Sequence, residues 1–323
     1  MSAAQSWPPI VIGTRGSDLA LWQARHLQAL LGGETAGVTL QIIKTRGDKL
    51  LDIPLQQQVD KGFFTKELES ALLDRHIDVA IHSLKDLPTQ MPPGLVLAAV
   101  PPRADVGDVL FVRPEAYDPE FALPVRHGAR VGTASLRRTA LLAHVAPQAK
   151  AEFLRGNVPT RLDKAKDGQL DAVVLARAGV SRLGLDWGDL LAFDLEPKLW
   201  LPAAAQGALG VQCRDDDRAL CERLQAIADP AATQAVTLER ELLQRMEGGC
   251  HSPFGALAEF NGEKARLWAG IANAAGQGWY TVTATGPADA VASRAEELLR
   301  VALAADRPAQ GGGVWVQAAR SWS

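Results

Sequence analysis

Short apolar runs and segments with helical periodicity alternate along most of the chain. Runs of strand length occupy residues 38–44 and 77–82, whereas the apolar side chains of residues 17–31 have roughly helical spacing. Such strand–helix alternation predicts α/β units with largely parallel sheets. From about Ala231 the pattern changes to a helix, a two-glycine break, three apparent strands and a long helix, which predicts a small α+β unit.

The composition excludes several classes of protein. Of 323 residues, 47% are hydrophobic and the net charge is only -3, so the chain can bury a core and is not intrinsically disordered. The first residues lack the basic and apolar regions of a secretory signal, and no apolar stretch reaches the roughly 20 residues of a bilayer-spanning helix. Three cysteines without a C-x-x-C pair argue against a disulfide framework and a zinc site. We therefore predict a cytoplasmic protein that binds no metal and no membrane.

Arginine recurs in the segments that follow the ends of the predicted strands. The arginines at these positions are Arg15, Arg46, Arg137, Arg138, Arg155 and Arg161. Guanidinium groups bind carboxylates and phosphates through paired hydrogen bonds, so this recurrence indicates a polyanionic ligand. A helix start at Ser135 adds backbone N–H groups that favour an anion. Nucleic acid is a poor candidate, because the net charge is negative, aromatic residues are 6% of the chain and none lies within these arginine motifs.

Lys85 and Asp86 follow another apolar strand, at the strand end where open α/β sheets usually bind ligands. One of the two can hold an anion while the other faces a cation. An ordinary charged pair on a surface loop would give the same pattern, so the spacing leaves both interpretations open.

Cys250 follows two glycines that end a helix, and it is either a small buried thiol or a reactive, covalently modified one. Its neighbour His251 is unsuited as a base, because neighbours in sequence rarely face each other. Cys213 in an apolar strand and Cys221 in a helix are predicted to be buried structural thiols.

Eight motifs together resemble one family, the porphobilinogen deaminases or hydroxymethylbilane synthases, in the family's order from about Ile10 to Leu303. The motifs are TRGSDLALWQA, TRGD, KGFFTKELE, DVAIHSLKDLP, VGTASLRR, RGNVPTRL, LPAAAQGALG and EGGCHSP. The resemblance implies a monomeric transferase of tetrapyrrole and heme biosynthesis, with porphobilinogen as its substrate. Enzymes of this family join four porphobilinogen molecules head to tail, releasing ammonia each time, and then release linear hydroxymethylbilane by hydrolysis.

The resemblance also implies the fold class, which is α/β with three domains. Two lobes similar to periplasmic binding proteins would be followed by a small α+β domain that carries the cofactor cysteine. The expected boundaries are residues 8–102 with 203–223 for the first lobe, 103–202 for the second and 224–323 for the last domain.

A dipyrromethane cofactor, made from substrate and joined to Cys250 by a thioether, is implied as the primer, with Asp86 as the catalytic carboxylate. Each pyrrole carries two carboxylates, so a chain of them needs many arginines, and a carboxylate stabilises the cation left by loss of ammonia. The expected cofactor contacts are Ser83, Lys85, Asp86, Ser135, Arg137, Arg138 and Gly156. The expected substrate contacts are Arg15, Ser17, Lys61, Phe64, Arg155, Arg161, Arg182 and Gln206, with Lys61 and Phe64 on a segment that covers the site.

The chain departs from the family pattern at three places. Residues 56–60 replace a Gly-rich, Lys-containing stretch, Ala134 stands where serine is common, and Ala205 replaces a frequent glycine. None of these changes affects Asp86 or Cys250, so they bear on the covering segment and the rate but leave the reaction class unchanged.

Two other functions stay open on the residues themselves. A non-catalytic two-lobed anion-binding protein would explain the arginines but not Cys250, and such proteins are commonly exported. A thiol enzyme using Cys250 would need a positioned base, which the sequence does not identify.

Overall fold

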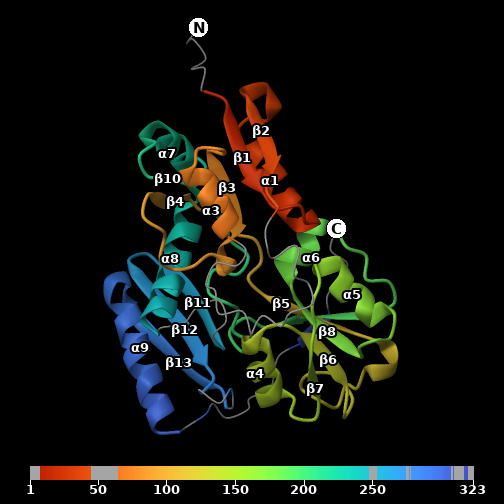
Figure 1. Ribbon diagram of the computed structural model, residues 1–323. Coiled ribbons are helices and arrows are strands. Elements are labelled where there is room, and N and C mark those ends of the chain that lie inside the picture. The colour runs from red at the N-terminus through yellow and green to blue at the C-terminus, as the bar shows by residue number, and fades with distance from the viewer. Residues whose placement is uncertain are drawn as a thin grey trace. The chain divides into compact units, whose positions relative to one another are not determined.

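The chain divides into two compact units. Unit 1 comprises Met1–Arg103 and Ala208–Thr233, and unit 2 comprises Ala104–Gly207 and Gln234–Ser323. The computed structural model describes residues 8–44, 65–246, 253–273, 276, 278–306, 308 and 316–318 (Figure 1). Among the helices in these ranges, none is both long and apolar enough to cross a lipid bilayer.

Unit 1 is built on a five-stranded sheet in the order β2-β1-β3-β10-β4. Its strands are β1 (Ile10–Thr14), β2 (Val38–Ile42), β3 (Val79–Ser83), β4 (Leu95–Ala99) and β10 (Leu209–Arg214), and its helices are α1 (Asp18–Leu30), α3 (Lys66–Leu73) and α7 (Arg218–Gln225). β1 is parallel to β2 and β3, whereas β10 is antiparallel to β3 and β4. The antiparallel direction of β10 departs from the largely parallel sheet that the sequence predicts. The chain re-enters unit 1 at β10, so no crossover helix from a neighbouring strand sets the direction of β10.

Each face of this sheet packs against helices. Ile12 and Val79 lie in a core cluster with Leu27 of α1 and Leu224 of α7, whereas Ala80 lies in a second cluster with α3. Adjacent residues of β3 therefore face opposite sides, as the two-residue period of a strand requires. The helix predicted over residues 17–31 is confirmed, and the Ser17 Oγ accepts a hydrogen bond from the Ala20 N–H at its start.

The larger sheet of unit 2 has six strands in the order β14-β9-β5-β8-β6-β7. Its strands are β5 (Asp108–Val112), β6 (Arg130–Thr133), β7 (Lys150–Phe153), β8 (Ala172–Ala176), β9 (Leu191–Leu195) and β14 (Val316–Ala318), and its helices are α4 (Leu136–Val145), α5 (Val158–Lys166) and α6 (Arg177–Leu183). β6 is parallel to β7 and β8, and β5, where the chain enters the unit, is antiparallel to β8 and β9. The sequence pattern left the tail after Gly311 unassigned, and β14 in that tail pairs with β9.

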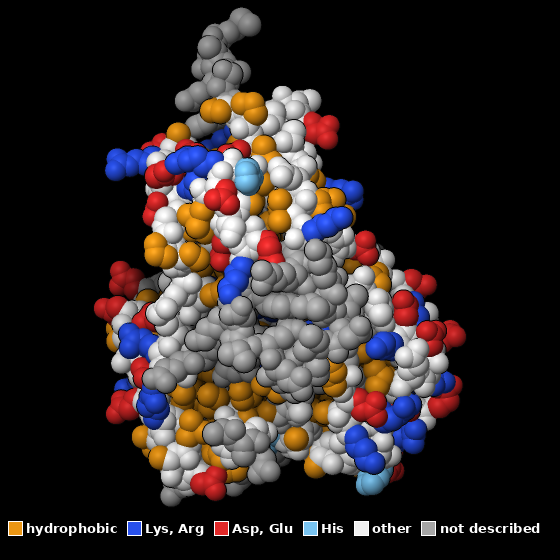
Figure 2. All heavy atoms as spheres, in the orientation of Figure 1, with side chains coloured by type: hydrophobic (Ala, Val, Ile, Leu, Met, Phe, Trp, Pro, Cys, Tyr) orange, Lys and Arg blue, Asp and Glu red, His pale blue; other side chains and the backbone are white. Residues whose placement is uncertain are grey.

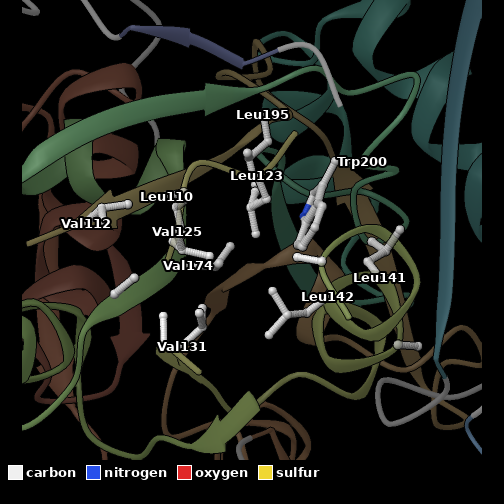
Figure 3. Packing of buried hydrophobic residues seen from close by; sticks show 14 of the residues in the cluster. Leu110, Val112, Leu123, Val125, Val131, Leu141, Leu142, Val174, Leu195 and Trp200 are labelled. Carbon is white, nitrogen blue, oxygen red and sulfur yellow. The ribbon is translucent and has the colours of Figure 1, made fainter. Parts of the chain in front are cut away.

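The core of this sheet surrounds Trp200. Figure 3 shows its indole beside Leu141 and Leu142 of α4, within a cluster that also contains Val131 and Val174 of the sheet. Trp200 has no exposed surface, so its indole N–H needs a buried acceptor, which the site described below supplies.

The remaining part of unit 2 is an antiparallel sheet of β11 (Phe254–Asn261), β12 (Lys264–Ile271) and β13 (Tyr280–Pro287), with α9 (Ala288–Ala304) and α8 (Pro230–Arg245), of which the part from Gln234 belongs to this unit. α9 lies along this sheet in Figure 1, and its Leu299 shares a buried cluster with Leu242 of α8 and Leu267 of β12. This element confirms the small α+β unit, and the two larger sheets confirm the α/β class. The exact domain boundaries stay a prediction.

Candidate functional site

Unit 1 gathers five predicted site residues at the carboxyl ends of two neighbouring strands. β1 and β3 pair in parallel, with Ile12 beside Val79, so the segments that follow them leave the sheet at one edge. Ser83 is the last residue of β3, and the segments that follow the two strands carry Arg15, Ser17, Lys85 and Asp86. These five residues therefore belong to neighbouring strand ends of one sheet, and their role in binding stays a prediction.

A short 3-10 turn, η3 (Leu84–Asp86), presents Lys85 and Asp86. Leu84 and Leu87 on either side are buried, and the Leu84 N–H donates to the carbonyl of Ala208 at 3.0 Å. The two leucines fix the turn to the core. Lys85 is half-buried and Asp86 is exposed. The Asp86 carboxylate is therefore accessible to a ligand, and the turn that carries it is held by buried side chains.

Gln23 on α1 is a site neighbour that the sequence prediction missed. It is buried, and its Nε2 donates to the Ser83 Oγ at 2.8 Å. Ser83 can still donate its own hydroxyl proton, so Gln23 orients that hydroxyl as a donor. The signal was present in the helical spacing, because Gln23 lies four residues before the buried Leu27 and is therefore a polar residue on an apolar face.

His82 is buried beside the turn and forms a polar link across the sheet. Its Nε2 lies 3.1 Å from the Gln212 Oε1, and the Gln212 amide in turn reaches Glu69 on α3. Burial, with a smaller contribution from the charge of Arg15, lowers the pKa of His82 to about 4, although the Gln212 hydrogen bond opposes this. His82 is therefore neutral at physiological pH.

This burial predicts a specific pH dependence of stability. Since the unfolded histidine takes up a proton near pH 6.5 and the folded one only near pH 4, stability is lost as pH falls through that window, by about 3 kcal/mol in total. His82→Gln should flatten this part of a urea-unfolding pH profile. The exposed His76, replaced by Gln, is the control and should leave the slope intact. An unchanged slope in His82→Gln would contradict the assignment.

Unit 2 holds a buried carboxylate, Asp108, that the sequence analysis did not single out. Its Oδ2 accepts from the Arg137 Nη2 at 2.8 Å, the Arg138 Nε at 3.0 Å and the Trp200 Nε1 at 2.9 Å. Its Oδ1 accepts from the Arg138 Nη2 at 2.7 Å and the Gln206 Nε2 at 2.8 Å. Burial alone would raise the pKa of Asp108, but the two guanidinium groups outweigh it and hold that pKa well below its usual range.

Arg137 and Arg138 are themselves buried, at 3% and 6% exposure. Arg138 uses its remaining Nη1 on the carbonyl of Val174, and Arg137 gives its Nη1 to the carbonyl of Leu201. The Arg137 Nε is a buried donor that has no acceptor within the described part of the chain. Two cations against one carboxylate leave the cluster with one net positive charge, which still suits an anion.

Four further predicted contacts follow the parallel strands β6 and β7, and these are Ser135, Arg155, Gly156 and Arg161. The Ser135 Oγ caps α4 by accepting from the Arg138 N–H, which fixes the backbone of that arginine. Gly156 has φ +118°, and a Cβ there would lie 2.9 Å from Thr160, so this turn requires glycine. The Arg161 Nε donates to the Gly156 carbonyl at 2.7 Å, which ties α5 to the turn.

Gln206 lies in the segment that ends this part of unit 2 at Gly207, and Arg182 contacts the same segment. Gln206 is fully buried and donates to Asp108 and to the carbonyl of Val106, so its amide N–H groups are used within the protein. The Arg182 Nη2 donates to the carbonyl of Gly207 at 2.7 Å, and burial lowers the pKa of Arg182 to about 10. Arg182 therefore remains a cation at neutral pH.

Ala205, the departure from the family's glycine, has φ +61°. The left-handed conformation costs a non-glycine residue about 1–2 kcal/mol, and replacing Ala205 by glycine removes this cost. The same replacement loses a buried methyl group, worth about 0.8 kcal/mol, and adds the conformational entropy of glycine to the unfolded chain. The gain and the losses nearly cancel. Ala205→Gly should therefore change the free energy of unfolding by less than about 0.5 kcal/mol. Ala204→Gly, at a buried position without positive φ, should cost about 1 kcal/mol or more. Equal losses in denaturant unfolding would contradict the strain at Ala205.

Four residues of the predicted site, Arg46, Lys61, Phe64 and Cys250, lie outside the described residues, as do residues 56–60 of the expected covering segment. Within the ranges that the structure does describe, no group of three or more His, Cys, Asp or Glu residues could hold a metal ion.

Two family models and two curated relatives that match this chain carry the same description, porphobilinogen deaminase. A family model described as porphobilinogen deaminase, dipyromethane cofactor binding domain, matches residues 10–222, and one described as porphobilinogen deaminase, C-terminal domain, matches residues 233–300. The porphobilinogen deaminase of Moorella thermoacetica is 44% identical over 297 residues, which cover 91% of this chain and 93% of that protein. That of Roseiflexus castenholzii is 43% identical over 295 residues, which cover 90% and 95%.

Solved structures with some likeness include the periplasmic VFT2 domain of Bordetella pertussis BvgS, at a TM-score of 0.39 and 18% identity, covering 67% of this chain and 85% of that one. The two family models together span most of the chain, and the relatives exceed 40% identity over nearly their whole length. This chain therefore belongs to the porphobilinogen deaminase family.

Proposed function

We propose that this chain is a hydroxymethylbilane synthase that joins four porphobilinogen molecules onto a Cys250-linked dipyrromethane primer and then releases the linear tetrapyrrole. The observation that carries the proposal is the match of residues 10–222 to the family's cofactor-binding domain. The arginine-rich strand ends of unit 2 and the accessible Asp86 of unit 1 are the chemistry that such a reaction needs.

The residues present fit a polycarboxylate cofactor. The buried Arg137 Nε, which has no acceptor among the described residues, and the net positive charge around Asp108 both favour an anionic group. Lys85 and the Ser83 hydroxyl are further donors in unit 1. When bound, the dipyrromethane supplies the pyrrole carbon that starts the chain.

The Arg138 donors and the Gln206 amide already have protein partners. We propose that Arg138 and Gln206 hold Asp108, at the start of β5, and thereby Arg137 in place. Direct binding of the cofactor's carboxylates is assigned to Arg137, Arg155 and Lys85. This division refines the expected contact set, in which all of these residues touched a ligand.

Asp86 carries the central step. Its carboxylate stabilises the positive charge that develops on porphobilinogen as ammonia leaves, and it accepts hydrogen bonds from pyrrole N–H groups. The same oxygen atoms can move the proton to the leaving amine and remove the one lost from the newly joined ring. Arg15, Ser17, Arg161 and Arg182 bind the substrate's acetate and propionate groups.

The test of this function is the intact mass of the purified protein, with a parallel sample treated with Ehrlich's reagent. We expect an excess mass of two linked pyrrole units and a dipyrromethane colour, both lost in Cys250→Ser, with Cys221→Ser as the matched thiol control that keeps them. A mass without the excess that added porphobilinogen fails to raise would overturn the enzyme assignment and favour plain anion binding.

We also propose that the protein is a cytoplasmic monomer that binds neither nucleic acid nor membrane. The free thiols of Cys213 and Cys221 suit a reducing compartment. Figure 2 shows Lys and Arg side chains interspersed with Asp and Glu on the face drawn, which is typical of a solvated surface. Light scattering at the 34.5 kDa of one chain would support the monomer, and a doubled mass would exclude it.

A further inference from the structure

Cys213 and Cys221 form a close thiol pair in unit 1. Their sulfur atoms lie 3.4 Å apart, and Cys221 Sγ also approaches the Arg214 carbonyl at 3.6 Å. A disulfide needs about 2.05 Å between sulfurs, so an approach of about 1.4 Å would join them. The sequence predicted two separate structural thiols, and their proximity comes from the return of α7 onto β10.

Both cysteines are carried by firmly anchored elements. The buried Arg214, next to Cys213, donates to the carbonyls of Leu72 and Ile77 and pairs with Asp78. Asp217 caps the start of α7 by accepting from the Leu220 N–H. The pair is therefore preorganised in the folded chain.

The two thiols differ in access. Cys213 is fully buried, whereas Cys221 is only half-buried within the same apolar cluster. Burial raises the pKa of the Cys213 thiol, and the contact with Cys221 raises it further. A reagent from solvent therefore reaches Cys221 before Cys213, and Cys213 is placed to react with the oxidised Cys221 sulfur.

We propose that Cys213 and Cys221 are a reversible dithiol–disulfide site, closed by a two-electron oxidant of the peroxide class. The Cys221 sulfur attacks one peroxide oxygen, the O–O bond breaks, and a sulfenic acid and one water result. The Cys213 sulfur then attacks the Cys221 sulfur, the S–O bond breaks, and a second water leaves with the thiol proton. Two thiols are oxidised, one hydrogen peroxide is reduced to two waters, and a dithiol reductant reverses the change.

The crosslink joins β10 to α7 and closes a short loop, so it restricts the unfolded chain more than the folded one. We expect the melting temperature of the oxidised protein to exceed that of the reduced protein by roughly 5 °C. This site is independent of Cys250 and of the proposed activity.

The test is hydrogen peroxide treatment of the folded full-length protein, followed by alkylation, tryptic digestion and mass spectrometry. Trypsin separates the two cysteines, because cleavage after Lys198, Arg214, Arg218 and Arg223 leaves them on residues 199–214 and 219–223. We expect these two peptides to be linked, an intact mass lower by about 2 Da, and full reversal by dithiothreitol.

Cys221→Ser and Cys213→Ala are the matched variants, and each should lose the linked peptide and the rise in melting temperature. Circular dichroism of the reduced variants is the check that they fold. The proposal is overturned if both cysteines of the wild type stay alkylatable, if Cys221 becomes sulfinic acid without a linked peptide, or if the linkage formed joins Cys250 or a second chain.

Discussion

Asp86→Asn is expected to lower kcat for porphobilinogen consumption by roughly a thousandfold while leaving the fold unchanged. The substitution keeps the shape of the side chain and removes its negative charge, so the cation that forms as ammonia leaves loses its counter-charge. The fold should be unaffected, because Asp86 is exposed on η3 while the buried Leu84 and Leu87 hold that turn.

The measurement is single-turnover ammonia release by holoprotein whose primer content has been checked by mass, so that loss of cofactor and loss of chemistry are separated. Asp74→Asn, at an exposed aspartate of the same unit, is the matched control and should keep full activity. Asp86→Glu should recover part of the rate, because the charge returns at a displaced position. Normal turnover in Asp86→Asn would remove this carboxylate from the mechanism.

The local elements and the strand-end arginines could be predicted, because their signals lie within a few residues of one another. Ser17 and Ser135 were identifiable as helix starts from type and position, and both accept the expected backbone hydrogen bond. The small α+β unit was likewise visible as a change of period near Ala231. Such features depend on spacing along the chain, which a sequence states directly.

The partners of the arginines could not be predicted in this way. Asp108 lies 29 residues before Arg137, and only the pairing of β5 with β8 and the packing of α4 bring the two together. His82 and Gln212 are 130 residues apart and meet because β10 returns from unit 2 to pair with β3. A long-range polar contact leaves no periodic trace in the sequence, so a buried acid among arginines was assigned no role.

Asp108→Asn should strongly destabilise unit 2, lowering the free energy of unfolding by about 3–5 kcal/mol. It leaves Arg137 and Arg138 buried without a counter-charge, and the new amide N–H group faces donors on the arginines, Trp200 and Gln206. Urea unfolding of the variant measures the loss.

Asp171→Asn is the matched control, because Asp171 also pairs with two arginines, Arg126 and Arg130. Their side chains are 51% and 42% exposed, against 3% and 7% for Arg137 and Arg138. Solvent screens the exposed pairs, so this variant should lose about 1 kcal/mol or less. Equal losses at Asp108 and Asp171 would show that burial does not set the strength of the Asp108 cluster.

A double variant separates the charge imbalance from the lost hydrogen bonds. Arg138→Gln added to Asp108→Asn removes one of the two stranded cations, so the double variant should be less destabilised than the sum of the single changes. Cofactor loading gives a second readout, because Arg137 keeps its position only while Asp108 and the Leu201 carbonyl hold its two terminal nitrogens. Strict additivity together with full loading in Asp108→Asn would mean that the carboxylate neither balances the arginines nor positions Arg137.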